Sequence, residues 1–163
     1  MKTVIVYYSC DGNCAFAAKQ IGKTLKADII QVQLTDEKKR HGASKMFWGI
    51  MQIMSGALPA IKPVNFDAEA YDLIILGAPV WASSPAPAIR TFLSQTKISG
   101  KKIALFMCHG GGMGKAMEKF KALLEGNSIV TEIDLNSPVK FINIEKSKEQ
   151  IDNWTEVLAK TTA

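Results

Sequence analysis

Hydrophobic residues concentrate in five short runs that are separated by longer, mostly polar stretches. The runs span residues 3–8, 28–33, 72–77, 102–108 and 128–135, and they are rich in valine, isoleucine and leucine. Several runs are apolar at every position rather than at every second one, which is typical of strands buried on both faces of a parallel sheet. The pattern therefore predicts five strands in a sheet with helices on each side.

Helical periodicity fills most of the gaps between the runs. It covers residues 15–26, 85–93, 113–124 and 148–160, with prolines near the start of the second segment. Because strand and helix alternate along the chain, we expect one α/β domain over residues 1–163, with right-handed crossovers. The predicted fold is a three-layer, doubly wound, five-stranded parallel sheet in the order 2-1-3-4-5. In this order a ligand binds beyond the carboxyl ends of strands 1 and 3.

Three unusual loops follow the strands that meet at that edge. Residues 9–14 follow the first run, residues 77–85 follow the third, and residues 108–114 follow the fourth and include a cluster of glycines. The first loop leads into a helix, whose opening backbone N–H groups lack partners and can bind an anion. With only Gly12 in it, this loop taken alone is equally consistent with an ordinary strand-to-helix connection. The convergence of all three loops predicts a ligand site.

An unusually long connection separates the second and third runs. Within it, residues 44–54 would form a helix that is apolar over most of its circumference. One interpretation is a crossover helix packed on the sheet. The other is a helix that partly covers the ligand edge or contacts a second copy of the chain, giving a homodimer through residues 46–54.

The charge and the cysteine content of the chain limit which partners and which cellular compartment we expect. The formal net charge is +5, but the lysines are scattered and no segment interleaves basic with aromatic residues, so we expect no nucleic-acid partner. The densest basic run, 38–41, is interpreted as a solvated loop. No apolar run approaches the roughly 20 residues of a membrane span. An odd number of cysteines and the absence of a signal-peptide pattern predict free thiols and a cytoplasmic protein.

The three loops, in this order, resemble those of the flavodoxin-like family, and the resemblance covers nearly the whole chain. Residues 9–14, Ser-Cys-Asp-Gly-Asn-Cys, resemble its phosphate loop, S/T-x-S/T-G-x-S/T. Residues 72–81 resemble its third strand and the loop beside the isoalloxazine ring. Residues 101–106 with Gly110 and Gly111 resemble its fourth strand and the loop at the pyrimidine edge of the flavin. The long connection is similar to that of a subgroup with an insertion before the third strand.

The resemblance implies non-covalent FMN in a site built from the three loops. Its phosphate would be held by the Ser9 hydroxyl, by close backbone approach at Gly12 and by the amides of residues 13–15. The residues implied for cofactor binding are Ser9, Cys10, Asp11, Gly12, Asn13, Cys14, Ala15, Pro79, Val80, Trp81, Ala82, Ser83, Cys108, His109, Gly110, Gly111, Gly112 and Gly114.

Two residues depart from the phosphate-loop pattern. Asp11 replaces a hydroxyl, and a carboxylate about 4 Å from a phosphate charge would cost on the order of 4 kcal/mol at an effective dielectric constant near 20. We therefore expect Asp11 to turn outward and cap the helix, with its amide facing the site. Cys14 replaces a second hydroxyl with a weak hydrogen-bond donor, which predicts reduced phosphate affinity.

The cysteines near this edge permit other readings. Cys10 and Cys14 are either a regulatory thiol pair or small buried residues. A metal site that also includes Cys108 and His109 is not expected, because the third strand would hold the two pairs roughly 10 Å apart.

Three positions on the second and third loops carry further expectations. Trp81 should contact the isoalloxazine, where aromatic surface shifts the flavin potential. Ser83 and Ser84 should bond a polar flavin edge or cap the following helix. A cationic His109 near the flavin N1 edge would stabilise the anionic reduced flavin.

The resulting prediction is an FMN-binding redox protein. It would be either an electron carrier that serves a redox partner protein or a small flavin-dependent oxidoreductase with a small electron donor or acceptor. Because Asp11 and Cys14 depart from the phosphate-loop pattern, the alternative is a flavodoxin-like binding or regulatory module that has lost FMN. A phosphoacceptor receiver domain is disfavoured, because the third strand ends in Gly77-Ala78-Pro79 without an acidic residue.

Overall fold

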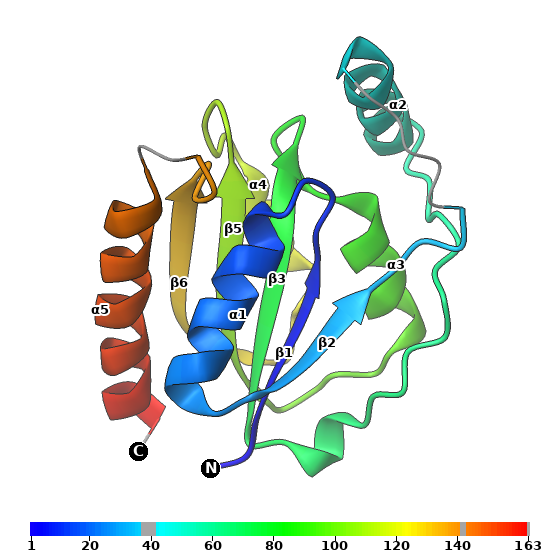
Figure 1. Ribbon diagram of the computed structural model, residues 1–163. Coiled ribbons are helices and arrows are strands. Elements are labelled where there is room, and N and C mark those ends of the chain that lie inside the picture. Colours follow the sequence, from blue (N-terminus) through cyan, green and yellow to red (C-terminus); the bar gives the residue numbers. More distant parts are fainter. Residues whose placement is uncertain (37–41, 141–142, 163) are drawn as a thin grey trace.

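The computed structural model describes residues 1–36, 42–140 and 143–162, and its centre is a parallel β-sheet (Figure 1). The parallel strands are β1 (Thr3–Tyr8), β2 (Asp28–Val32), β3 (Leu73–Trp81), β5 (Lys102–His109) and β6 (Ser128–Asn136). They lie in the order β2-β1-β3-β5-β6, and the short strand β4 (Ser84–Pro85) pairs antiparallel with β3. The predicted order of the parallel strands is confirmed.

Helices cover both faces of the sheet (Figure 1). On one face lie α1 (Asn13–Leu25) and α5 (Ile144–Thr162), on the other α3 (Pro87–Gln95) and α4 (Ala116–Ala122), and a 3-10 helix, η1 (Ala68–Ala70), precedes β3. The core accordingly has two clusters. Ile5 and Ile75 are buried with α1 and α5, whereas Val4 and Ile74 are buried with α3 and α4. Because successive strand residues enter opposite clusters, the central strands are apolar at every position.

β3 runs further toward the predicted ligand edge than its apolar run indicates. The segment 77–81, expected as loop, continues the strand, and Gly77 lies beside Phe106 of β5. A Cβ atom at Gly77 would lie 1.9 Å from the Phe106 Cζ atom. This glycine therefore makes room for an aromatic ring and does not start a turn. Pro85, expected at the start of a helix, pairs with Val80 in β4.

The helix α2 (Gly42–Met54) forms in the long connection, as predicted, but it does not pack on a face of the sheet. It stands at the carboxyl end of β3 (Figure 1), where the Trp48 ring centroid lies 5.9 Å from that of Trp81. A Cβ atom at Gly49 would lie 3.3 Å from Trp81 Cε3. The interpretation as a crossover helix on the sheet is therefore wrong, and the contacts are those of a helix covering part of the ligand edge.

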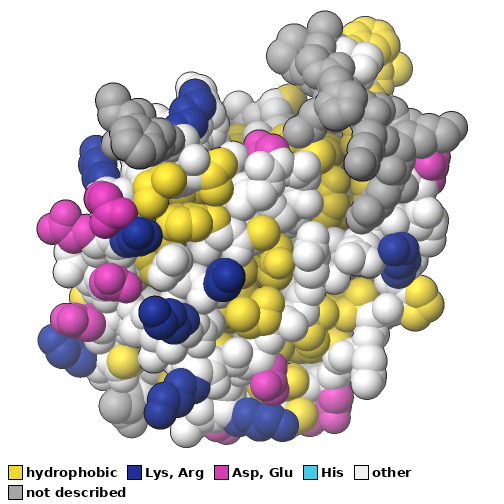
Figure 2. All heavy atoms as spheres, in the orientation of Figure 1, with side chains coloured by type: hydrophobic (Ala, Val, Ile, Leu, Met, Phe, Trp, Pro, Cys, Tyr) yellow, Lys and Arg dark blue, Asp and Glu magenta, His cyan; other side chains and the backbone are white. Residues whose placement is uncertain are grey.

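The surface carries interspersed charges and one apolar projection. On the face formed by α1 and α5, basic and acidic side chains alternate without forming a single patch (Figure 2). Phe47, Met51 and Met54 of α2 are exposed. Among the residues described, none of the helices is both long enough and apolar enough to cross a membrane. The basic run 38–41 lies outside the described residues, as do positions 141–142 and 163.

Candidate functional site

The loop between β1 and α1 leaves two backbone amides free at the start of a helix. Gly12 adopts φ 90°, and its carbonyl accepts the Phe16 N–H at 2.9 Å. The Ser9 hydroxyl accepts the Ala15 N–H at 3.1 Å. Among the described residues, the N–H groups of Gly12 and Cys14 have no acceptor. Such groups at a helix N-terminus are suited to an anion.

Asp11 turns its carboxylate to the first turn of α1, as its expected capping role requires. Its Oδ1 atom accepts the Asn13 N–H at 3.2 Å, and the side chain is exposed. The residue at the N-cap position is Gly12 rather than Asp11. The expected set of amides from 13–15 needs correction, because two of its three members already bond to side chains: Asn13 to Asp11, and Ala15 to Ser9.

The Cys14 side chain does not take the place of a phosphate-binding hydroxyl. It is fully buried under α1, where it interacts with the Cys108 thiol at the end of β5. Burial, reinforced by this contact, raises the pKa of the Cys14 thiol well above its usual value. The expected separation of roughly 10 Å is wrong for this pair, because α1 crosses the sheet and brings its first turn over β5. Cys10 is exposed, so it is not paired with Cys14.

The β3–β4 hairpin forms the second loop of the edge. Its two central residues, Ala82 and Ser83, adopt φ 44° and 54°, which is the signature of a type I′ turn. Ser84 accepts a hydrogen bond from Lys119 Nζ at 2.8 Å, and α3 begins after Ala86 without a side-chain cap. The serines therefore do not cap this helix, because β4 separates them from it.

Trp81 sits in an aromatic cluster at the end of β3. Its ring contacts Tyr8 at a centroid distance of 6.0 Å and Trp48 of α2 at 5.9 Å, both edge to face. Tyr8 ends β1 and is buried, whereas Trp81 is partly exposed. The expected flavin contact of Trp81 stays a prediction, and the neighbours Tyr8 and Trp48 were not anticipated.

The loop after β5 is held by the His109 ring. The Gly112 N–H donates to Nδ1 at 3.1 Å, and Nε2 lies 3.1 Å from the Asp134 carboxylate of β6. The loop also touches the hairpin, since a Cβ atom at Gly114 would lie 2.2 Å from Ser83 Oγ. The second and third loops thus meet, as the topology predicted.

A fourth loop, which follows β6, also belongs to this edge. The Ser137 N–H donates to the His109 carbonyl at 2.8 Å, and the Val139 N–H donates to Asn13 Oδ1 at 3.2 Å. These bonds link the fourth loop to the third and to the first. The sequence does not mark this loop, because the segment has no glycine-rich signature. Its place after a parallel strand was the only available signal.

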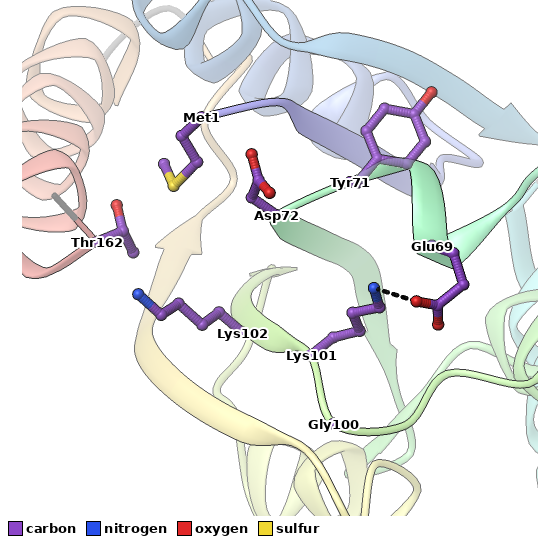
Figure 3. A pocket seen from close by; sticks show the side chains of 8 residues that line it. All are labelled: Met1, Glu69, Tyr71, Asp72, Gly100, Lys101, Lys102 and Thr162. Atoms are coloured by element: carbon purple, nitrogen blue, oxygen red, sulfur yellow. Dashed lines mark hydrogen bonds and ion pairs between the residues drawn. The ribbon is translucent and has the colours of Figure 1, made fainter.

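The amino ends of the strands carry a separate cavity of about 500 Å³ (Figure 3). Lys101 and Glu69 face one another across it with a 2.9 Å ion pair, and Asp72 and Lys102 add one charge of each sign. No predicted site residue lines it, and it opens at the edge opposite the loops. Among the described residues, no group of three or more His, Cys, Asp or Glu side chains is arranged to hold a metal ion.

Known proteins share this sequence pattern and architecture. The flavodoxin of Megasphaera elsdenii is 28% identical over 148 residues, which cover 82% of this chain and 89% of that protein. The crystal structure of a Lactobacillus acidophilus flavoprotein in complex with FMN is 25% identical, with a TM-score of 0.74 over 94% of this chain and 98% of that one. A crystal structure of a Bacteroides eggerthii protein, 21% identical, shares the fold with a TM-score of 0.77 over 97% and 98% of the two chains. A family model described as flavodoxin matches residues 2–158. Since that match runs almost from end to end and the loops lie at one edge in the family's order, this chain belongs to the flavodoxin family.

Proposed function

We propose that this chain binds FMN non-covalently at the carboxyl edge of the sheet and acts as a redox protein. The observation that carries the proposal is the pair of free amides, Gly12 and Cys14, at the start of α1. Family membership supports it, as does the similarity to a flavoprotein crystallised in complex with FMN. When bound, the flavin would supply the electron-transfer chemistry, and the protein would hold and shield it.

The residues at the edge fit the parts of FMN. The amides of Gly12 and Cys14 lie at the positive end of the α1 dipole and suit a phosphate without a basic side chain. The partly exposed Trp81 offers aromatic surface for the isoalloxazine. The loop 110–114 offers backbone groups, because its glycines carry no side chains to block approach.

A matched pair of glycine variants tests the phosphate site. Gly12 has φ 90° and Gly126, in the turn before β6, has φ 84°, so alanine is similarly strained at both. Gly12→Ala should displace the free amides and weaken FMN binding at least tenfold, because hydrogen bonds to a charged group contribute about 1.5–3 kcal/mol each. Gly126→Ala should lose similar stability and keep its FMN affinity.

The assay is titration of FMN fluorescence, with the visible spectrum of the purified protein as a second readout. A yellow protein that quenches FMN stoichiometrically supports the proposal. A colourless protein that does not bind FMN at high micromolar concentration contradicts it. That result would favour the alternative, a flavodoxin-like module that has lost the cofactor.

Asp11 is the residue that favours this alternative, and two effects of its carboxylate can be separated. Its charge opposes a phosphate, and its Oδ1 atom occupies the Asn13 N–H. Asp11→Asn removes the charge and keeps the acceptor, whereas Asp11→Ala removes both. If charge limits affinity, both variants should bind FMN more tightly than the parent. If the occupied amide limits it, only the alanine variant should do so.

The choice between electron carrier and oxidoreductase is a further part of the proposal, and we favour an electron carrier. Membership of the flavodoxin family supports this preference. Stopped-flow reduction by NADH or NADPH tests this preference. Direct reduction of the bound flavin at turnover rates would contradict it and indicate an oxidoreductase.

The outer face of α2 is the surface that we propose for contact between two copies of the chain. Phe47, Met51 and Met54 are 67%, 49% and 77% exposed and lie four and three residues apart, on one side of the helix. Because each copy has a net charge of +5, an uncharged stripe is the surface where copies repel least. Phe47→Glu should abolish a dimer seen by light scattering, whereas Val157→Glu, on the exposed side of α5, should not. A monomeric parent protein would refute this contact.

A further inference from the structure

The His109 side chain connects two strands and one loop of the proposed cofactor edge. It ends β5, and its ring lies 3.1 Å from the Asp134 carboxylate of β6 and 3.1 Å from the Gly112 backbone nitrogen. The His109 side chain is only 11% exposed, while that of Asp134 is 59% exposed. The ring is thus held on both sides.

The two contacts fix which ring nitrogen carries the proton. Because the Gly112 N–H donates to Nδ1, this nitrogen must present its lone pair. The proton of the neutral ring is then on Nε2, which donates to Asp134 Oδ2. A carboxylate partner of this kind selects a tautomer and orients the ring. Asp134 therefore acts on the loop through the His109 ring.

We propose that Asp134 is a positioning residue that locks His109 in the Nε2–H form, and that this ring pins the 110–114 loop until it is protonated. The inference rests on the proposed function only where it concerns FMN. Protonation places a second hydrogen on Nδ1, opposite the Gly112 N–H, so two donors face one another and the bond is lost. The imidazolium stays paired with Asp134, and the loop is released.

The groups that contact His109 determine how the loop should respond to pH. Asp134 is the charged group within ion-pair distance of the ring among the described residues, and Ser137 donates both its N–H and its hydroxyl to the His109 carbonyl. Because a proton on Nδ1 removes the acceptor of the Gly112 N–H, FMN affinity should fall as the pH falls. This role differs from the expected stabilisation of a reduced flavin by a cationic ring.

Nuclear magnetic resonance of the FMN-free protein tests the pinning directly. At pH 8 the ¹⁵N shifts of His109 should show the Nε2–H tautomer, and the Gly112 amide should exchange slowly. At pH 5.5 that protection should fall at least tenfold. The only other histidine of the chain is His41, so a His109→Gln spectrum completes the assignment. A neutral Nδ1–H tautomer, or Gly112 protection that does not change with pH, would overturn the proposal.

Variants separate the positioning role from general stability. Asp134→Asn should increase the fraction of the Nδ1–H tautomer and speed Gly112 exchange at pH 8. The matched control Glu132→Gln, on the same strand and in an ion pair with Lys121 at 3.0 Å, should leave both unchanged. Equal effects of the two substitutions would show that Asp134 acts only through the stability of the fold.

FMN titrations between pH 8 and pH 5.5 then test the consequence for the cofactor. Because the phosphate itself takes up a proton near pH 6, the comparison is with His109→Gln, whose amide accepts from Gly112 but cannot be protonated. The parent should lose about three- to tenfold more affinity than this variant. Equal losses would refute the link to the cofactor. Absence of FMN binding at pH 8 would instead refute the proposed function and leave the spectroscopic result standing.

Discussion

The hairpin turn beside the proposed cofactor site stores backbone strain that a single substitution should release. Ala82 is exposed and adopts φ 44° in the two-residue turn between Trp81 and Ser84. A residue with a Cβ atom pays roughly 1–2 kcal/mol in this left-handed region, and glycine does not. Against this gain, glycine adds about 0.5–1 kcal/mol of conformational entropy to the unfolded chain. Ala82→Gly should therefore stabilise the fold by about 0.5–1 kcal/mol.

The same substitution at an exposed helical position isolates the strain. Ala159 lies within α5 and is also exposed, and Ala159→Gly should destabilise the fold by about 1 kcal/mol. Both variants raise the entropy of the unfolded chain by a similar amount, so their difference reports the native backbone. That difference should be about 1.5–2 kcal/mol.

Urea unfolding of the FMN-free protein, followed by tryptophan fluorescence, measures both variants. FMN must be removed, because a ligand that binds only the native state adds its own stabilisation. The slope of free energy against urea concentration should be the same in all proteins. If Ala82→Gly and Ala159→Gly destabilise the protein equally, the turn is not strained and the reasoning fails.

Four further outcomes depend on whether individual side chains are buried or exposed. Ellman's reagent should label Cys10 in the native protein and Cys14 only on unfolding, because Cys10 is exposed and Cys14 is buried. Burial raises the pKa of the Cys14 thiol, so the contribution of this thiol to the free energy of unfolding should be complete below the pKa of an unfolded thiol, about 8.5, and should decline as the pH rises above it. Urea unfolding of the parent and of Cys14→Ala at several pH values measures this contribution. Gly77→Ala should cost about 3 kcal/mol in the same unfolding assay, because its Cβ atom would lie 1.9 Å from the Phe106 ring, and Phe106→Leu should restore part of the loss. Gln52→Leu should stabilise by about 1 kcal/mol, because the buried Oε1 atom of Gln52 has no hydrogen-bond partner among the described residues; a loss of stability would show that this oxygen is satisfied in solution.

The sheet and its ligand edge were predictable because each depends on short-range information. Strands buried on both faces must be apolar at every position, and parallel strands must end at the same edge. Those two rules were sufficient to bring together the loops after β1, β3 and β5. The role of Asp11 was also local, because a carboxylate two residues before an amide at a helix start is placed to accept from it.

Two contacts that the sequence did not predict depend on where a helix lies relative to the sheet. Cys14 reaches Cys108 because α1 lies diagonally over β5, and no spacing along the chain encodes that angle. Trp48 reaches Trp81 because α2 stands at the end of β3 instead of on its face. A helix packed on the sheet and a helix at the edge of the sheet can both be apolar, so the composition of this segment could not distinguish the two placements.

One irregularity in the sheet determines that Asp134 meets His109. Ile103 pairs with Ile129, but Ala104 pairs with Thr131, so one residue of β6 bulges out of the register. A shift of one residue transfers every later side chain to the opposite face. With the bulge, His109 pairs with Asn136. Asp134 lies two residues before Asn136 on β6, so its side chain is on the same face of the sheet as that of His109. Without the bulge, Asp134 would pair with Cys108 and direct a carboxylate into the buried cluster under α1 and α5. The bulge therefore keeps a charge out of the core and provides the partner that orients the His109 ring.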